Sequence, residues 1–433
     1  MILPFPPGAG PARMVPVDGL VAPQAPETLP DTGLDESVLA GLALKLAFTA
    51  ADFTDEWMVR RLRLPLPLVR ETLEGLRADG LVDVLGPSGP LTLRYAIGPR
   101  GRERAARLLE ISGYIGPAPV SLDAYAAVLE AQLAQAPAVR PGQVAAALSD
   151  LVIPDEAVQL AGLAAASGRS LFVFGPAGNG KTTLGRLLHD AVQGDVWVPH
   201  GIAVEGNIIR VFDPVHHQAV GAEHRGIDQR WVRVRRPLVV LGTEITLDTF
   251  ELTYSPTLRF YEAPLHLKAN GGTLLIDDLG RERVDTYRLL NRWVRPLEHG
   301  EDHLTLTTGQ KVRVPVRQLL ILATNLDPEA VMDAAFLRRL GYRLYLGGPT
   351  PEQYGRIFER YAARRGLDIA PGLVPRVVDR YRAEGRVLRG CEPRDLVERV
   401  RDICSYEGRP PELSEELLDR AWRGYFGPGR VST

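Results

Sequence analysis

Apolar and polar positions recur at helical spacing between residues 35 and 110. The spacing predicts a helix that starts near Asp35, a second with Thr54 as its N-cap, and a third that opens on prolines and ends at Gly80. Two short strands separated by Pro-Ser-Gly then predict a β-hairpin, and a fourth helix begins near Gly98. Three helices followed by a hairpin predict a winged helix-turn-helix over residues 35–110.

The hydrophobic pattern changes at Asp150, and from there to residue 346 short apolar runs alternate with helical patterns. The expected strands are RSLFVFG, DVWVP, GTLLIDD and QLLILATN, and the expected helices include KTTLGRLLHDAV and TYRLLNRWVRPLEHG. Strands that alternate with helices predict an α/β domain with a doubly wound parallel sheet over residues 150–346. Residues 347–433 lack strands and predict a small domain of about four amphipathic helices.

Two stretches lack a sustained period. Residues 1–34 are rich in Pro, Gly and Ala and predict a flexible tail, whereas residues 111–149 predict a linker with one helix at 121–135. No window approaches the ~18 apolar residues of a membrane span, and no signal peptide is recognisable, so we expect no membrane insertion. The two cysteines, Cys391 and Cys404, are expected to be small core residues, and the protein is expected to be cytoplasmic.

Composition narrows the classes of function. The 433 residues include 51 Lys and Arg against 53 Asp and Glu, a net charge of -2, and 45% of them are hydrophobic. This balance excludes a disordered chain and argues against binding nucleic acid through bulk charge. Only four basic residues are lysines, so a lysine inside a motif carries more weight than usual.

One such lysine lies in a glycine-rich loop between an expected strand and an expected helix. Gly175 is followed after four residues by Gly180-Lys181-Thr182. Backbone N–H groups of such a loop wrap a phosphate, the lysine reaches the β- and γ-phosphates, and the hydroxyl of Thr182 ligates Mg²⁺. The predicted nucleotide-binding residues are Gly175, Pro176, Ala177, Gly178, Asn179, Gly180, Lys181, Thr182 and Thr183. No guanine-reading Asn-Lys-x-Asp motif occurs, so the expected nucleotide is ATP.

Two later strands end in polar residues. GTLLI runs into Asp277-Asp278, and QLLILAT runs into Asn325. In a phosphate-loop NTPase the acidic strand is expected beside the phosphate-loop strand, where Asp277 would hold Mg²⁺ through water. Asp278 would then orient and deprotonate the attacking water, and Asn325 would hold that water from the other side.

Taken together, these motifs resemble the AAA+ ATPases. The resemblance covers residues 150–433: the phosphate loop, the Asp277-Asp278 strand, the Asn325 strand, the run Ala335-Phe-Leu-Arg-Arg-Leu340, and a helical domain with Gly390-Cys-Glu-Pro-Arg-Asp-Leu396, in the family's order. It implies an ATP-hydrolysing homo-oligomer, in that family a hexameric ring. It also implies that Arg338 and Arg339 supply an arginine finger to the neighbouring subunit and that Arg394 senses the γ-phosphate in its own subunit. A guanidinium suits both roles because its fixed fork stabilises charge spread over phosphate oxygens.

Two details refine the resemblance. A hairpin expected from Leu304–Thr307 and Val312–Val316, with its turn at Gly309, precedes the Asn325 strand, as in the MoxR-like branch of the family. The usual second acid of the family is Glu, whereas this chain has Asp278, which is one methylene shorter. The resemblance therefore implies slow hydrolysis, with Glu282 as a substitute base if its turn folds back.

The charge of residues 35–110 does not decide whether this unit binds protein or DNA. Residues 35–110 contain eleven acids and eleven bases, and the presumed recognition helix 65–79 has a net charge of -1. Non-specific DNA affinity depends on phosphate contacts, so docking to a protein is favoured over DNA binding. The expected function is remodelling of a protein client; the alternative is an ATP-switched DNA-binding regulator. Phe260 and Tyr261, in a bulky segment at 196–262, are either substrate-gripping aromatics or half-buried strand residues.

Overall fold

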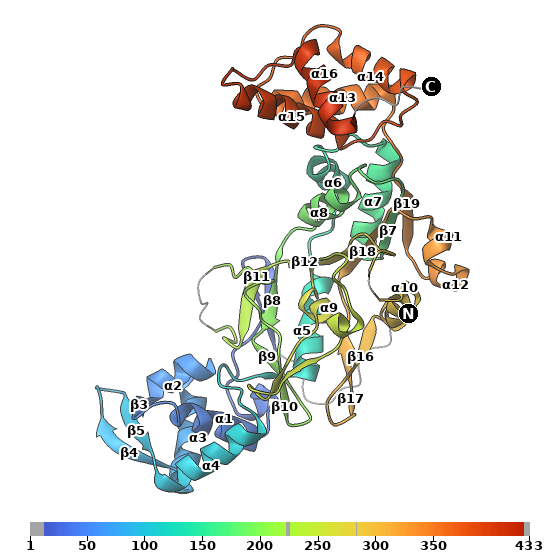
Figure 1. Ribbon diagram of the computed structural model, residues 1–433. Helices are drawn as coiled ribbons and strands as arrows, with labels where there is room; N and C mark the ends of the chain where they lie inside the picture. Colours follow the sequence, from blue (N-terminus) through green and yellow to red (C-terminus); the bar gives the residue numbers. More distant parts are fainter. Residues whose placement is uncertain (1–12, 222–225, 283, 428–433) are drawn as a thin grey trace.

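A parallel β-sheet forms the centre of the computed structural model, which describes residues 13–221, 226–282 and 284–427 (Figure 1). Its five strands run in the order β12-β15-β18-β7-β19, and every neighbouring pair is parallel. The strands are β7 (Leu171–Phe174), β12 (Leu238–Leu241), β15 (Thr273–Ile276), β18 (Leu319–Thr324) and β19 (Tyr342–Tyr345). The central strands β15 and β18 are buried throughout because both faces of the sheet are covered.

Helices cover both faces of this sheet, as predicted for a doubly wound fold. One face packs against α6 (Pro141–Ala147), α7 (Asp155–Ser167) and α8 (Lys181–Ala191). The other packs against η2 (Leu247–Phe250), α9 (Leu265–Lys268), α10 (Thr286–His299), α11 (Pro328–Val331) and α12 (Ala334–Leu337). Residues of β7 alternate between the two cores: Val173 belongs to the first and Phe172 to the second.

Two expectations about this sheet are wrong. The acidic strand β15 does not lie beside the phosphate-loop strand β7, because β18 lies between them. The segment DVWVP forms β8 (Asp195–Pro199), which pairs antiparallel with β11 (Trp231–Arg235) outside the sheet. A single residue, His200, separates β8 from the next strand, which leaves no room for the crossover that parallel strands need. The edge position belongs to β12 instead.

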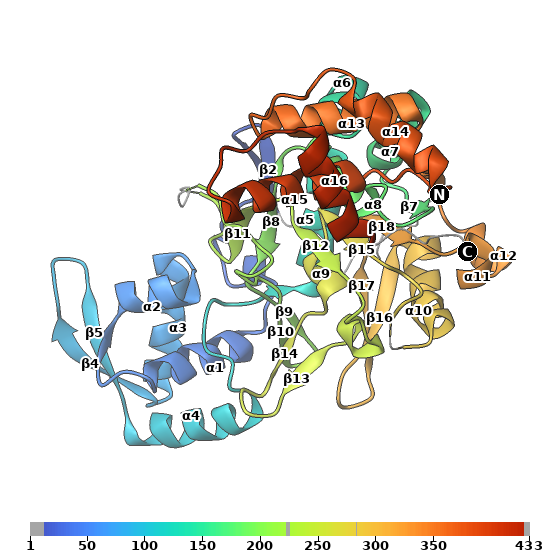
Figure 2. The same cartoon turned by 45° about the horizontal axis from the view of Figure 1, so that its top comes forward.

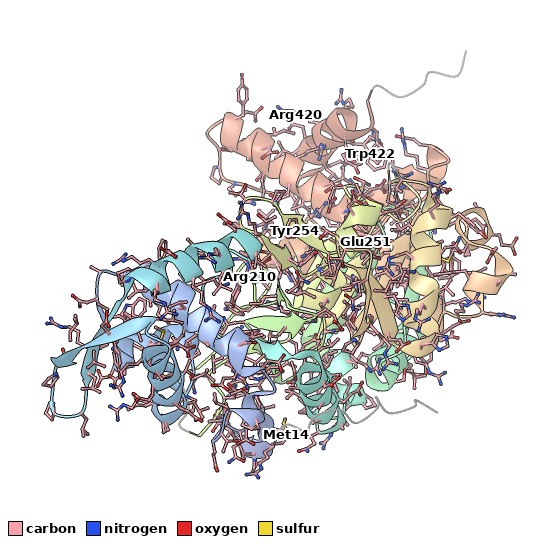
Figure 3. The ribbon with its side chains drawn as sticks, turned by 90° about the horizontal axis from the view of Figure 1, so that it is seen from below. Met14, Arg210, Glu251, Tyr254, Arg420 and Trp422 are labelled. Atoms are coloured by element: carbon pink, nitrogen blue, oxygen red, sulfur yellow. The ribbon has the colours of Figure 1, made fainter. Side chains whose placement is uncertain are left out.

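A second β-region is formed by residues between α8 and β12, with further strands from before α8 and after β12. Its five-stranded sheet has the order β13-β14-β10-β9-β6. The strands are β6 (Val120–Ser121), β9 (Gly201–Val204), β10 (Asn207–Arg210), β13 (Thr253–Ser255) and β14 (Phe260–Glu262). Figure 3, which shows the molecule from below, labels Arg210 and Tyr254 in this region, between the N-terminal helices and the C-terminal unit that carries Trp422.

Two sequence interpretations change here. Helix α5 (Leu122–Ala134) confirms the helix expected at 121–135, but Tyr125, Val128 and Leu129 are buried in the core of the β-region, so this stretch is not a linker. Phe260 and Tyr261 are 7% and 1% exposed. The Tyr261 hydroxyl lies 2.6 Å from Thr307 Oγ1, in the turn of the hairpin β16 (Glu301–Thr305) and β17 (Lys311–Pro315). Both aromatic residues therefore pack inside the protein, and the interpretation of them as substrate-gripping residues is wrong. The hairpin predicted before the Asn325 strand is confirmed.

The described part of residues 1–34 is not a flexible tail. Strands β1 (Met14–Val17) and β2 (Leu20–Pro23) form a hairpin, which is followed by η1 (Pro30–Thr32). Ala22 is fully buried in the core of the β-region, and Asp228 N donates to Pro23 O at 2.9 Å. Burial of one face of the hairpin supplies the order that the composition did not predict. Residues 1–12, part of the same prediction, lie outside the described residues.

The helices and the hairpin predicted for residues 35–110 are present. They are α1 (Glu36–Ala47), α2 (Asp55–Leu62), α3 (Leu66–Ala78) and α4 (Pro99–Ile111), with β3 (Phe53–Thr54), β4 (Val82–Pro87) and β5 (Leu93–Ile97) in the order β3-β5-β4. Thr54 Oγ1 accepts from Trp57 N at 3.1 Å, which confirms the N-cap. Leu42, Met58 and Leu73 belong to the core of this unit. It lies at the end of the molecule farthest from the C-terminal helices (Figure 1).

The C-terminal unit contains the four predicted helices. They are α13 (Pro351–Arg364), α14 (Leu373–Ala383), α15 (Glu392–Tyr406) and α16 (Glu415–Phe426). Tyr354, Phe358 and Trp422 fill its core, and Figure 2 shows the unit beside α6, α7 and α8. None of the helices in the described ranges is both long and apolar enough to cross a membrane.

Candidate functional site

The glycine-rich loop runs from the end of β7 into α8, as its spacing predicts. Gly178 and Gly180 have φ of 82° and 88°, a conformation that residues with side chains rarely adopt. A β-carbon at Gly175 would lie 2.4 Å from Leu346 O, so close backbone packing also requires glycine there. Pro176, Ala177 and Thr183 are exposed, and Asn179 is buried.

Lys181 turns back onto the loop that precedes it. Its Nζ donates to Gly175 O at 2.8 Å and to Pro176 O at 2.9 Å, and the residue is buried. Burial lowers the pKa of Lys181, although the nearby carboxylates of Asp277 and Asp278 oppose the shift. The ammonium group is therefore held at the loop where a phosphate would meet it.

Thr182 and Asp277 form the first contact between the loop and the acidic strand. Thr182 Oγ1 donates to Asp277 Oδ2 at 2.6 Å, although the two residues are 95 positions apart. Asp277 N donates to Leu241 O at 2.8 Å, which holds the end of β15 against β12. The hydroxyl and carboxylate that the sequence assigned to Mg²⁺ therefore lie side by side.

Asp278 and Asn325 form the second contact. Asn325 Nδ2 donates to Asp278 Oδ1 at 2.7 Å, which joins the end of β18 to the end of β15. Asp278 has φ of 53°, unusual for a residue with a side chain but tolerated by Asp. Leu279 N donates to Ala323 O at 2.9 Å, so the two strand ends are also joined through the backbone.

Glu282, the alternative base, closes the turn that follows. Its Oε2 accepts from Gly280 N at 2.9 Å and from Thr286 Oγ1 at 3.4 Å, whereas Oε1 is buried without a partner. The carboxylate thus supports the backbone before α10, and no hydrogen bond joins it to Asp277 or Asp278 in the described contacts.

The two arginines of the Phe-Leu-Arg-Arg run lie at the opposite edge of the sheet, near Ser170 at the start of β7. Arg339 donates to Glu298 Oε1 at 2.6 Å and to Ala335 O at 2.7 Å. The side chain of Arg338 is exposed and forms no hydrogen bond or ion pair with the described residues. The two arginines, which the sequence analysis assigned the same role, therefore have different surroundings: Arg339 is paired and the Arg338 side chain is exposed.

Arg394 lies in the first turn of α15, where its side chain is 59% exposed and pairs with Asp395 at 2.9 Å. The contact between the C-terminal unit and the loop comes from residues that sequence reasoning missed. Cys391 N donates to Gly178 O at 2.8 Å, and Gly390 N donates to Asn179 Oδ1 at 3.1 Å. Cys404 is buried as expected, but Cys391 is only half-buried because it lies against the loop. The sequence did offer one signal for this contact: Gly390 opens the Gly390–Leu396 motif, and a glycine there allows close approach to the loop.

The donor set at the loop fits Mg²⁺. One hydroxyl and one carboxylate, from Thr182 and Asp277, are hard oxygen ligands that lie together. Magnesium commonly binds one or two carboxylates and takes its other ligands from water and phosphates. No group of three or more His, Cys, Asp or Glu side chains that could hold a metal occurs in the described part of the chain.

Comparisons with known proteins add little to this geometry. Residues 350–424 match a family described as a domain of unknown function, DUF8689. No curated protein matches the chain. Among solved structures, a mutant RuvB from Thermotoga maritima is 14% identical, with 66% of this chain and 70% of that chain covered and a TM-score of 0.37. NtrX from Brucella abortus, solved in complexes with ATP and with ADP, is 16% and 17% identical. The covered shares are 63% and 74% of this chain and 58% and 64% of NtrX, with TM-scores of 0.39 and 0.40. TM-scores below 0.5 establish neither family nor activity.

Proposed function

We propose that this protein is an AAA+ ATPase that binds ATP with Mg²⁺ and hydrolyses it. The observation that carries the proposal is the meeting of three segments at one end of the sheet. Thr182 of the loop is bonded to Asp277, and Asp278 next to it is bonded to Asn325. A phosphate loop, two carboxylates and a polar amide in contact are the parts that phosphoryl transfer to water requires.

Each residue has a distinct role in this proposal. Backbone N–H groups of residues 175–180 and the start of α8 bind the phosphates, and Lys181 exchanges its loop carbonyls for phosphate oxygens. Thr182 and Asp277 hold Mg²⁺, which neutralises charge on the phosphates when bound. Asp278 accepts the proton of the attacking water, and Asn325 orients both the carboxylate and that water. Hydrolysis is slow because Asp278 is shorter than the usual Glu.

The proposal extends to an oligomer, a hexameric ring in the resembling family. Arg338 lies at the edge of the sheet opposite the loop, so it can act only on nucleotide held by a neighbouring subunit. Arg339 holds α12 against Glu298 and positions Arg338. Arg394 senses the γ-phosphate of its own subunit once its pairing with Asp395 is broken.

The N-terminal unit, which we interpret as a winged helix, serves in this proposal to dock a protein client. Arg70 of the presumed recognition helix is bonded to Asp55 at 2.9 Å, and Arg77 pairs with Glu74, so neither charge is free for DNA phosphates. The hairpin exposes Leu85 and Leu91, which are 49% and 79% accessible. Apolar tips and neutralised cations favour a protein surface over DNA.

Calorimetry of ATP binding tests the proposal. Lys181→Ala removes the ammonium at the phosphates, so binding should be lost at ATP concentrations that saturate the wild type. Lys311→Ala, at an exposed position of β17, is the matched control and should bind normally. Wild-type affinity in Lys181→Ala would show that the loop is not the nucleotide site.

A further inference from the structure

A cavity of about 1170 Å³ opens at the edge of the central sheet where the strands begin. Ser170, Gly272, Leu319 and Gly341, at the starts of four strands, line it. The phosphate loop follows the far end of β7. The cavity is therefore separate from the phosphate loop and the two strand ends that face it, although Arg338 and Arg339 line it.

The walls of this cavity are strongly cationic. Two carboxylates line it, and both are engaged: Glu298 pairs with Arg339 at 2.6 Å, and Glu301 pairs with Arg313 at 3.6 Å. The six arginines that line the cavity are Arg169, Arg236, Arg313, Arg317, Arg338 and Arg339. The excess of positive charge favours an anion.

Arg236 gives the sharpest evidence, because it is only 8% exposed. Its guanidinium donates to the carbonyl oxygens of Gln193 and Gly271, but no described carboxylate lies within ion-pair distance. Burial lowers the pKa of Arg236, yet an arginine stays charged under ordinary conditions. Asp195 opposes that shift from beyond ion-pair distance and is itself paired with Arg233. A buried cation with no carboxylate in direct contact is costly, and an anion in the cavity would offset that cost.

Other polar groups of the cavity also lack partners. Arg169 and Arg338 are exposed and form no side-chain hydrogen bond or ion pair with described residues. The side-chain amide of Gln318 has both its nitrogen and its oxygen buried without a hydrogen bond. Trp293 and Leu340 supply apolar wall beside these groups. Three cations without carboxylate partners, an unsatisfied amide and an apolar wall suit an organic ligand with several negative charges.

We propose that this cavity binds a small phosphate-bearing ligand through Arg169 and Arg236. The planar fork of arginine matches phosphate oxygens in pairs, and adjacent phosphates of one ligand supply charges for both guanidinium groups. The volume exceeds what a triphosphate alone would fill, so the apolar wall contacts the organic body of the ligand. This inference does not rest on the proposed ATPase activity, because Arg169 and Arg236 have no part in it.

The test uses the full chain carrying Lys181→Ala and inorganic tripolyphosphate as the probe, followed by calorimetry and thermal unfolding. We expect saturable binding and a raised Tm. Adding Arg169→Glu should weaken binding at least tenfold, and adding Arg236→Gln should weaken it as well. Arg104→Glu, at an exposed arginine of α4 outside the cavity, is the matched control and should leave binding unchanged.

The outcomes separate this proposal from the previous one. Absence of tripolyphosphate binding in the Lys181→Ala protein, or binding that Arg169→Glu leaves intact, would overturn the cavity site. ATP binding by the same protein that Arg169→Glu abolishes would support it and show that an organic body is tolerated, whereas ATP binding that Arg169→Glu leaves intact would belong to the loop and would count against the cavity. The loop is tested separately, by comparing ATP binding to the wild type and to the Lys181→Ala protein, so either proposal can fail without the other.

Discussion

At the edge where the strands of the central sheet end, Lys181, Asp277 and Asp278 each have a hydrogen-bonding partner. At the edge where the strands begin, the side chains of Arg169 and Arg338 have none among the described residues, and the buried charge of Arg236 has no described carboxylate within ion-pair distance. The first arrangement is pre-organised for chemistry, whereas the second is completed by a charge from outside the chain. The same sheet thus presents one edge satisfied within the chain and one that requires a ligand or a second subunit.

The largest effect is expected at the incomplete edge. Arg338→Ala should lower ATP turnover roughly 10³–10⁵-fold while ATP affinity is kept, because the finger acts only on the transferred phosphate. Arg339→Ala, the matched neighbour, breaks the ion pair with Glu298 and should lose much less. Steady-state kinetics measure the ATP turnover of each variant, and calorimetry measures its ATP affinity.

Subunit mixing sharpens this prediction. Arg338→Ala subunits retain a loop, and Lys181→Ala subunits retain a finger, so the mixture should recover part of the turnover. Specific activity should also rise faster than linearly with protein concentration until the oligomer forms. Flat activity down to a monomeric concentration, together with an inactive mixture, would exclude a finger from a neighbouring subunit.

A somewhat smaller loss is expected at the satisfied edge. Asp278→Asn keeps the size of the side chain and removes the base, so turnover should fall about 10²–10⁴-fold with ATP binding retained. Asp278→Glu should keep or raise activity if the short carboxylate limits the reaction. Normal turnover in Asp278→Asn would assign the base elsewhere, and Glu282 would be the next residue to replace.

Asp302 tests what a fully paired buried charge contributes near the cavity. It lies 2.9 Å from His266 Nε2, is bonded to Arg292, and is 2% exposed. Burial raises its pKa, but the adjacent His266 imidazole and the Arg292 guanidinium outweigh burial and lower the pKa to about 2. Asp302→Asn should lower the free energy of unfolding by up to about 3 kcal/mol, because Arg292 loses a charged hydrogen-bond partner but keeps Glu251 at 3.1 Å.

The same carboxylate gives a prediction for pH. Its folded pKa of about 2 lies below the unfolded value of about 3.9, so its stabilisation is present above roughly pH 4. That stabilisation is lost as the pH falls toward 2. Denaturant unfolding at several pH values should show this loss in the wild type and not in Asp302→Asn. Asp379→Asn, in an exposed ion pair, is the control and should keep the wild-type pH dependence.

The smallest effect concerns the contact between the loop and the C-terminal unit. A β-carbon at Gly178 would meet Cys391 Sγ at 2.6 Å, and Gly178 also has φ of 82°. Gly178→Ala should destabilise the protein by about 2 kcal/mol, partly through backbone strain and partly through the clash. Gly168→Ala carries similar strain in open space and should cost about half as much. Adding Cys391→Ala to Gly178→Ala should recover the difference in Tm; no recovery would mean that the clash is absent.

The sequence predicts the satisfied edge well because its signals are local. A loop of fixed spacing follows one strand, and Asp278 and Asn325 each end another, so the topology of parallel strands brings them to one edge. The adjacency of β15 and β18 was not predicted, since pattern reveals strands but not their order. DVWVP has the composition of a central strand, and only the one-residue connection after it shows otherwise.

The incomplete edge could not be predicted. Its arginines come from segments as distant as Arg169 and Arg338, and none belongs to a compact motif shared with the others. Their convergence depends on strand order and on where α7 and α10 end. The ordered N-terminal hairpin escaped prediction for a related reason, because its apolar face is defined only by a partner surface some 200 residues away, near Asp228.

That hairpin also constrains the order in which the chain can fold. Ala25 N donates to Gly226 O, and Arg230 donates to Thr32 O and Pro119 O, so three segments far apart in sequence close one core. Closing such long loops costs entropy before any contact repays it, which slows folding. During synthesis, residues 13–34 leave the ribosome long before residues 226–230 and gain these partners only after about residue 235 has emerged. A segment made early is therefore among the last to be buried, and its apolar strands stay exposed to other chains until then.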